Sequence, residues 1–371
     1  MSGFSPSVVV VGAGVVGSAC AEALAEAGCR VTVLESAFPG AGVTGAAMGH
    51  LVVMDDSEPQ FALTASSRRL WTERAAALPP DVEDDACGTL WVAADEEEMA
   101  QVLKKAAFYA ARGEKAEVLD AAALREAEPQ LRHGLVGALR VPGDRVVYPP
   151  AAARAFLESA RGLGAEIRCG ATVDTLGPGR ARCGDRLIEA DIVLNAAGPG
   201  APRLTPGLPV VPRKGHLVIT DRYPGFLRHQ VVELGYLKSA HTLTRESVAM
   251  NVQPRKTGQL LIGSSRELVG SDPSLNRPLC AHMLRRAAEY VPGLTRLQAL
   301  RTWVGFRPAT PDKLPLVGKW ERGLWIAAGH EGLGVTTALG TARLVVDLVL
   351  GRTPDLDPAP FDPRRAMPAD G

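Results

Sequence analysis

The first forty residues carry the pattern that most constrains how this chain can fold. Four valines at residues 8–11 run into Gly12-Ala13-Gly14-Val15-Val16-Gly17, and an alanine-rich segment follows. A strand, a tight glycine turn and a helix in this order predict a βαβ unit that binds a dinucleotide. Gly12 permits the turn, Gly14 lets the backbone approach a pyrophosphate, and Gly17 allows the helix to pack closely on the strand.

An acidic residue completes this pattern. Glu35 ends the next apolar run, 18 positions after Gly17, where a carboxylate is expected to accept a hydrogen bond from a ribose hydroxyl. An acid at this place favours a free 2′-hydroxyl over a 2′-phosphate. The alternative, a glycine-rich turn in an ordinary βαβ crossover, leaves the position of Glu35 unexplained.

Length and composition narrow the class of protein. A chain of 371 residues is long enough for two domains, and these need not be contiguous in sequence. With 41 basic and 41 acidic residues the chain has no net charge, which argues against nucleic acid or an anionic membrane as a partner and favours a small-molecule ligand. The six cysteines and seven histidines show no metal-ligand spacing, and the longest apolar stretch, 8–21, is too short for a membrane span. We therefore expect a cytoplasmic protein without a metal site.

The glycine-rich segments distinguish between two dinucleotides. NAD and FAD both fit the first fingerprint, but three loops of small residues, at 12–17, 40–50 and 329–334, indicate an extended ligand and favour FAD. No later glycine cluster, including 198–200, completes a second GxGxxG pattern, so a nicotinamide is not the expected electron donor.

The middle of the chain has a different pattern. Strand-like runs at 216–220, 230–234, 247–252 and 260–263 are separated by turn residues, which predicts an antiparallel sheet that carries the substrate. The predicted fold is therefore α/β (α+β), a Rossmann-like FAD-binding domain interleaved with an antiparallel-sheet domain. We assign 1–80, 145–210 and 308–352 to the FAD-binding domain, 81–144 and 211–307 to the substrate-binding domain, and 353–371 to a loosely held tail.

One arginine stands out as a substrate ligand. Arg307 lies in an apolar segment that is fixed by prolines, where a guanidinium is costly unless it meets an anion. A bidentate substrate carboxylate meets that need, and an internal ion pair with Asp312 meets it equally well. The segment 329–334 precedes a helix whose positive end would stabilise negative charge on a reduced flavin.

Together these motifs resemble the D-amino-acid oxidase superfamily, which includes glycine oxidase, monomeric sarcosine oxidase and D-amino-acid dehydrogenase. The resemblance covers nearly the whole chain, and it is most specific at 305–312 (GFRPATPD) and 314–318 (LPLVG). Within the superfamily, residues 47–56 (AMGHLVVMDD) and 329–337 (GHEGLGVTT) are most similar to D-hydroxyproline dehydrogenases and to the catalytic subunit of hydrogen cyanide synthase.

This resemblance implies an activity and its residues. It implies hydride transfer from the α-carbon of a small D-amino or cyclic secondary amino acid to flavin N5, with Arg307 on the substrate carboxylate. His50 would tune the flavin or contact substrate, unless it is a hydrogen-bonded structural histidine, and Tyr236 would add a hydroxyl to the carboxylate contact. Covalent flavin attachment through a C-terminal cysteine is not expected, because no cysteine follows Cys280.

The predicted FAD contacts come from every part of the glycine-rich framework. They are Gly12, Gly14, Val15, Val16, Gly17, Glu35, Ser36, Thr44, Ala46, Ala47, Met48, Gly49, His50, Val173, Ala197, Gly198, Gly329, His330, Gly332, Leu333, Gly334, Val335 and Thr336.

The resemblance also bears on partners and leaves alternatives open. Some relatives work beside small iron–sulfur subunits, so electron-transfer subunits are candidate partners, with a homo-oligomer as the alternative. A flavin-bearing structural subunit of a larger complex and a glycine or sarcosine type oxidase are the competing functions. An FAD enzyme of tRNA would need a basic stripe that the balanced charge does not favour.

Overall fold

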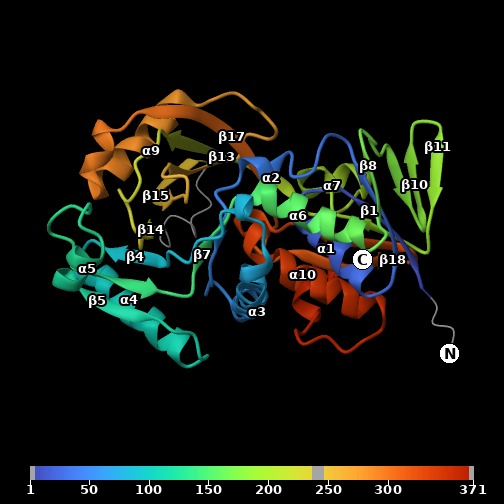
Figure 1. Ribbon diagram of the computed structural model, residues 1–371, viewed down its shortest axis with the longest axis horizontal. Helices are drawn as coiled ribbons and strands as arrows, with labels where there is room; N and C mark the ends of the chain where they lie inside the picture. The colour runs from blue at the N-terminus through green and yellow to red at the C-terminus, as the bar shows by residue number, and fades with distance from the viewer. Residues whose placement is uncertain (1–4, 236–245, 367–371) are drawn as a thin grey trace.

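The computed structural model describes residues 5–235 and 246–366, and its chain forms two lobes that lie side by side (Figure 1). One lobe is built on a six-stranded sheet and the other on an eight-stranded sheet. The chain crosses between the lobes several times, so each sheet takes strands from distant parts of the sequence.

The six-stranded sheet has the order β18-β19-β12-β1-β2-β8, and all neighbours are parallel except β18 and β19. Its strands are β1 (Ser7–Val11), β2 (Arg30–Glu35), β8 (Glu166–Cys169), β12 (Ile192–Asn195), β18 (Leu316–Glu321) and β19 (Leu324–Ala328). The helices of this lobe are α1 (Val15–Glu26), α3 (Glu58–Arg74), α6 (Pro149–Gly162) and α10 (Gly334–Val349). Helix α1 packs against both α6 and α10, and this contact forms the centre of the first hydrophobic core.

The glycine turn behaves as the sequence predicts. Gly12 has a φ of +105°, and a Cβ at this residue would lie 2.6 Å from the carbonyl oxygen of Ala196 on the neighbouring chain segment. A Cβ on Gly17 would lie 2.0 Å from the carbonyl oxygen of Gly12. Gly12 therefore allows the turn to lie against the segment that follows β12, and Gly17 allows α1 to lie close to the turn.

The eight-stranded sheet has the order β17-β13-β16-β15-β14-β4-β6-β5. Its strands are β4 (Thr89–Ala93), β5 (Glu117–Asp120), β6 (Gly137–Val141), β13 (Val211–Thr220), β14 (Gln230–Glu233), β15 (Glu246–Pro254), β16 (Leu260–Glu267) and β17 (Ala299–Ala309). The helices α4 (Glu96–Ala110), α5 (Ala121–Ala127) and α9 (Arg277–Tyr290) belong to this lobe (Figure 1). The sheet is antiparallel as predicted, except that β14 runs parallel to β4. Because the chain passes through the other lobe between β4 and β14, it is free to return in the parallel direction.

Smaller elements complete the fold. A three-stranded sheet contains β9 (Thr175–Gly177), β10 (Arg180–Cys183) and β11 (Arg186–Glu189), and a two-stranded sheet pairs β3 (His50–Leu51) with β7 (Arg145–Val146). The short helices are α2 (Val43–Ala46), α7 (Ala201–Leu204), η1 (Ala75–Ala77), η2 (Pro80–Val82), η3 (Gly198–Gly200), η4 (Pro292–Arg296), η5 (Glu331–Leu333), η6 (Ala359–Phe361) and η7 (Pro363–Ala366). The apolar run 187–194 is divided between β11 and β12.

Two residues of the C-terminal segment contact the rest of the fold. The side chain of Phe361 is only 1% exposed, and Arg365 pairs with Asp312 at 2.9 Å and donates to the carbonyl oxygen of Leu314. Phe361 and Arg365 are therefore docked on the fold, whereas the looseness expected of the tail 353–371 as a whole stays a prediction. Proline-rich composition disfavours long helices and strands, but it allows the short helices η6 and η7 and docking through one aromatic ring and one arginine.

Helix α10 is unusually apolar for its length. Within the described residues, the stretch 331–349 is long and apolar enough to cross a membrane, and 67% of it is buried inside the fold. Its apolar residues pack against α1 and α3, which accounts for its composition without a bilayer.

Candidate active site

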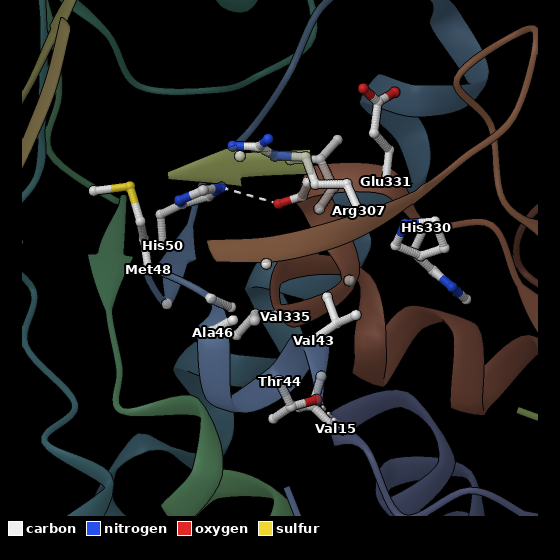
Figure 2. Close-up of a pocket in the computed structure, with 18 of the residues that line it drawn as sticks. Val15, Val43, Thr44, Ala46, Met48, His50, Arg307, His330, Glu331 and Val335 are labelled. Carbon is white, nitrogen blue, oxygen red and sulfur yellow. Dashed lines mark hydrogen bonds between the residues drawn. The ribbon is translucent and has the colours of Figure 1, made fainter. Parts of the chain in front are cut away.

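A single cavity collects most of the predicted site residues (Figure 2). One wall is the N-terminal end of α1 together with the segment 43–50, and the other is the cavity face of the eight-stranded sheet. The turn at η5 closes the space between them. The cavity is therefore placed between the nucleotide lobe and the sheet predicted to carry the substrate.

The N-terminal end of helix α1 is a candidate binding site for an anion. Residues 14–17 line the cavity, and the helix cap, Gly14, contributes no side-chain hydrogen bond to the first turn. The amide of Val15 donates to the hydroxyl of Thr44 at 3.0 Å, which joins the glycine turn to α2. Because Thr44 already accepts from Val15, a pyrophosphate here would bind the other backbone N–H groups of the first turn.

Glu35 occupies the position expected of a ribose ligand. Its carboxylate accepts hydrogen bonds from the amides of Ala13 at 2.7 Å and Ala37 at 2.8 Å, and so it is fixed at the end of β2 beside the glycine turn. The glycine cradle and this oriented carboxylate fit the pyrophosphate and ribose of FAD.

Arg307 reaches the cavity by crossing the strand next to its own. It lies on the edge strand β17, in register with Arg213 on β13, and its Nη1 donates to the carbonyl oxygen of Ser265 on β16 at 3.1 Å. The guanidinium passes over Gly215 of β13, where a Cβ would lie 2.3 Å from Nη1. Asp312, the internal acid considered as its partner, pairs with Arg365 instead.

The charges around the cavity favour an anionic ligand. Among the described lining residues are four cationic side chains, Arg213, Arg266, Arg307 and Lys313, and two acidic ones, Asp56 and Glu331. Arg213 pairs with Glu331 at 3.0 Å and Lys313 with Asp56 at 3.5 Å. The lining therefore contains two more cationic than acidic side chains.

Two histidines lie at the cavity in the neutral form. Nε2 of His50 is 3.2 Å from the carbonyl oxygen of Gly332, so this nitrogen carries the proton (Figure 2). Burial, and to a smaller extent the positive charge of Arg307, lowers the pKa of His50 to about 4. Burial lowers the pKa of His330 to about 3, and its Nε2 contacts the hydroxyl of Thr341 in α10 at 3.1 Å. Neither imidazole is charged at neutral pH.

Most, but not all, of the predicted residues line this cavity. Those that do are Gly14, Val15, Val16, Gly17, Thr44, Ala46, Ala47, Met48, Gly49, His50, Gly198, Arg307, His330, Gly332, Leu333, Gly334 and Val335. Those outside the lining are Gly12, Glu35, Ser36, Val173, Ala197, Gly329 and Thr336. Thr336 does not line the cavity itself, but its hydroxyl donates to the carbonyl oxygen of His50 at 2.9 Å and so holds that lining residue in place. Tyr236 lies outside the described residues.

The sequence analysis missed the polar residues of the sheet face. These include Trp91, Arg213, Gln230, Asn251 and Arg266; Gln60, which lies on α3, was missed as well. Most of them alternate with apolar residues in strands, and the alternation alone does not say which face of a strand meets a cavity. Among residues 5–235 and 246–366, no group of three His, Cys, Asp or Glu side chains is arranged to hold a metal ion.

Comparisons with known proteins agree with this geometry. Residues 7–348 match the family described as FAD dependent oxidoreductase (DAO). The chain is 30% identical to the hydrogen cyanide synthase subunit HcnC of Pseudomonas aeruginosa, over 97% of this chain and 96% of that protein. It is 29% identical to a D-amino acid dehydrogenase of Xanthobacter autotrophicus, over 95% and 97% of the two chains.

One relative is similar in both sequence and structure. The glycine oxidase of Geobacillus kaustophilus is 31% identical to this chain, over 95% of each protein. Its crystal structure superimposes with a TM-score of 0.87 at 29% identity, covering 99% of this chain and 100% of that one.

Proposed function

The chain belongs to the DAO family of FAD-dependent oxidoreductases that act on amino acids, and within it we propose an enzyme for small D-amino or cyclic secondary amino acids of the D-hydroxyproline and D-proline type. The observation that carries this proposal is the guanidinium of Arg307, held over Gly215 at the cavity that the glycine cradle also lines. The proposed division into domains follows the two sheets, with 1–80, 145–210 and 308–352 around the cofactor.

The residues of this chain position the substrate. Arg307 binds the substrate carboxylate, and the excess of cations in the lining draws this anion into the cavity. With the carboxylate fixed, the α-carbon hydrogen is directed toward the cofactor, so orientation supplies most of the rate enhancement. FAD, when bound, supplies the acceptor for the hydride that leaves the α-carbon.

No side-chain base is required in this scheme. The amine enters in its neutral form, and His50, with a pKa near 4, does not take its proton at neutral pH. His50 donates from Nε2 to the carbonyl oxygen of Gly332, which fixes the orientation of this neutral imidazole in the cavity wall.

We also propose electron-transfer partners and a cytoplasmic location for this protein. One relative is named as a subunit of a larger enzyme, which supports small electron-transfer subunits as partners here, with a homo-oligomer as the alternative. All six cysteines are free, which supports a reducing compartment such as the cytoplasm.

Anaerobic reduction of the purified flavoprotein tests the function. Glycine, sarcosine, D-proline, D-hydroxyproline and L-proline are mixed with it separately, and bleaching of the flavin absorbance is followed. The proposal expects the cyclic D-amino acids to bleach fastest, whereas fastest bleaching by glycine or sarcosine identifies a glycine oxidase type enzyme. Absence of bleaching by every amino acid contradicts enzymatic turnover and favours a structural subunit.

The same assay tests Arg307. Arg307→Ala should retain flavin but lose about 2 to 5 kcal/mol of transition-state stabilisation, because a buried charge pair is lost. Unchanged catalytic efficiency in this variant removes the carboxylate assignment.

A further inference from the structure

Two arginines lie next to each other on the cavity face of the eight-stranded sheet. Arg213 on β13 is directly opposite Arg307 on β17, and both side chains line the cavity. Residues paired in this way project from the same face of the sheet with their Cβ atoms about 5 Å apart. Like charges directly opposite each other destabilise a strand pair, so this arrangement calls for a compensating anion.

The guanidinium of Arg307 is close to Arg213 along the strand as well. It passes over Gly215, where a Cβ would lie 2.3 Å from its Nη1. Gly215 follows Arg213 by two residues on β13, and so the two residues share a face and are about 7 Å apart. Arg213 is therefore the neighbouring cation for a molecule whose carboxylate binds Arg307.

Glu331 supplies the compensating anion from the turn at η5. Its Oε1 accepts a hydrogen bond from Nη1 of Arg213 at 3.0 Å, and the side chains of Arg213 and Glu331 are only 9% and 14% exposed. The turn also lies beside Arg307, because a Cβ on Gly332 would be 3.6 Å from the Nε of Arg307 (Figure 2). The carboxylate of Glu331 thus occupies Arg213 at the wall of the cavity in which Arg307 lies.

The backbone of Glu331 supports a role for this carboxylate. The residue has a φ of +47°, a conformation that glycine adopts far more readily than glutamate. A larger residue persists in this region of φ where its surroundings compensate for the conformational cost. The ion pair with Arg213 is such a compensation, and it links the turn to the sheet across the cavity.

The carboxylate of Glu331 has the same chemistry as the side chain of an acidic amino acid. With Glu331 in place, a second carboxylate of a ligand would meet an arginine that is already paired and a like charge beside it. Such repulsion discriminates strongly in a site with little water. A neutral amide of the same shape does not meet this repulsion.

We propose that Glu331 is a specificity-determining residue, which occupies Arg213 and so excludes ligands that carry a second carboxylate. This inference rests on the proposed function, and it restricts the substrates to amino acids with a single carboxylate.

Variants of Glu331 test the inference by ligand binding and by turnover. Succinate and its half-amide succinamate are titrated into the flavin-loaded enzyme, and binding is followed by the change in flavin absorbance. Turnover is compared by kcat/KM for D-glutamate and D-glutamine. The members of each pair have nearly the same shape and differ by one charge. Glu331→Gln removes the charge at constant volume, and Glu331→Gly removes the side chain with a residue that suits the positive φ.

The expected result is a shift toward ligands with two carboxylates. The wild-type enzyme should favour succinamate and D-glutamine, and both Glu331 variants should raise the dicarboxylate-to-amide ratio at least about tenfold. Adding Arg213→Gln to Glu331→Gln should abolish this gain, because Arg213 is the cation that the first substitution releases. Asp56→Asn is the matched control, since it removes a carboxylate from the same lining but releases Lys313 instead, and it should leave the ratio unchanged.

Three results would overturn the inference. They are a wild-type preference for the dicarboxylate, a ratio that neither Glu331 variant changes, and an equal rise in Asp56→Asn, which would assign the effect to the total charge of the cavity. A loss of affinity that is equal for both members of a pair leaves the ratio unchanged and shows that the ion pair only fixes η5. Because the titration needs no turnover, failure of every amino acid to reduce the flavin would refute the proposed function and not the exclusion of a second carboxylate.

Discussion

The substitution Gly215→Ala tests how Arg307 is positioned. The added Cβ would lie 2.3 Å from Nη1 and 3.0 Å from Cζ of Arg307, and 2.8 Å from the carbonyl oxygen of Ser265. Since non-bonded heavy atoms reach their optimal separation near 3.5 Å, the guanidinium must retreat by about 1 Å. That movement lengthens the 3.1 Å hydrogen bond to Ser265 beyond hydrogen-bond distance.

Such a displacement has a calculable effect on catalysis. A misplacement of about 1 Å costs on the order of 100-fold in rate, so kcat/KM for flavin reduction should fall about 100-fold. This corresponds to about 2.7 kcal/mol, measured by anaerobic stopped-flow reduction with flavin still bound.

A control and a double variant separate positioning from general damage. Gly162→Ala places a Cβ with no heavy atom within 4 Å, so it should leave kcat/KM unchanged. If Gly215 acts only through Arg307, adding Gly215→Ala to Arg307→Ala should cause no further loss. A Gly215→Ala enzyme with wild-type kcat/KM, or a double variant with fully additive losses, refutes the reasoning.

Three further predictions follow from the cofactor lobe and its C-terminal segment. Glu35→Ala should weaken FAD binding at least tenfold in fluorescence titrations of the apoprotein, because it removes the acceptor of the ribose hydroxyl and of the Ala13 amide. The control Glu26→Ala changes an exposed residue and should leave FAD affinity unchanged. Equal affinities of the two variants would contradict the ribose assignment. Phe361→Ala should lower the free energy of unfolding by about 3 kcal/mol, because the ring is buried. The control Phe38→Ala, at a side chain 66% exposed, should change this free energy by less than about 0.5 kcal/mol. A small effect in both variants would show that the tail is not docked. Because burial lowers the pKa of His330 to about 3, the stability that its neutral form contributes above pH 6.5 is lost as the pH falls toward 3, and His330→Gln should flatten this slope in urea unfolding between pH 4 and 7. A slope that His330→Gln leaves unchanged would speak against a buried neutral imidazole.

The sequence identified the nucleotide half of the site because its signals are local. The turn at Gly12 needs a positive φ, the packing of α1 needs Gly17, and Glu35 follows the second strand directly. Each of these requirements is met within about thirty neighbouring residues. Arg307 was predicted to meet an anion for a related reason, since a charged group in an apolar segment requires an anionic partner.

The substrate half depends on contacts that the sequence does not record. Trp91 and Asn251 lie in one row across the sheet only because β4 pairs in parallel with β14, and more than a hundred residues separate these two strands. A Gln or Asn in a strand is equally compatible with solvent, with the core or with a cavity. Only the assembled sheet determines which of the three applies, and for the same reason the docking of Phe361 was not predicted.

The most direct test of the central claim is a crystal structure of the flavin-loaded enzyme with pyrrole-2-carboxylate, an aromatic analogue of proline that has no α-hydrogen to lose. The account predicts that both carboxylate oxygens lie within hydrogen-bond distance of the Arg307 guanidinium, with the ring facing the flavin. A carboxylate bound by Arg213 or Arg266, with Arg307 out of hydrogen-bond distance, would contradict it.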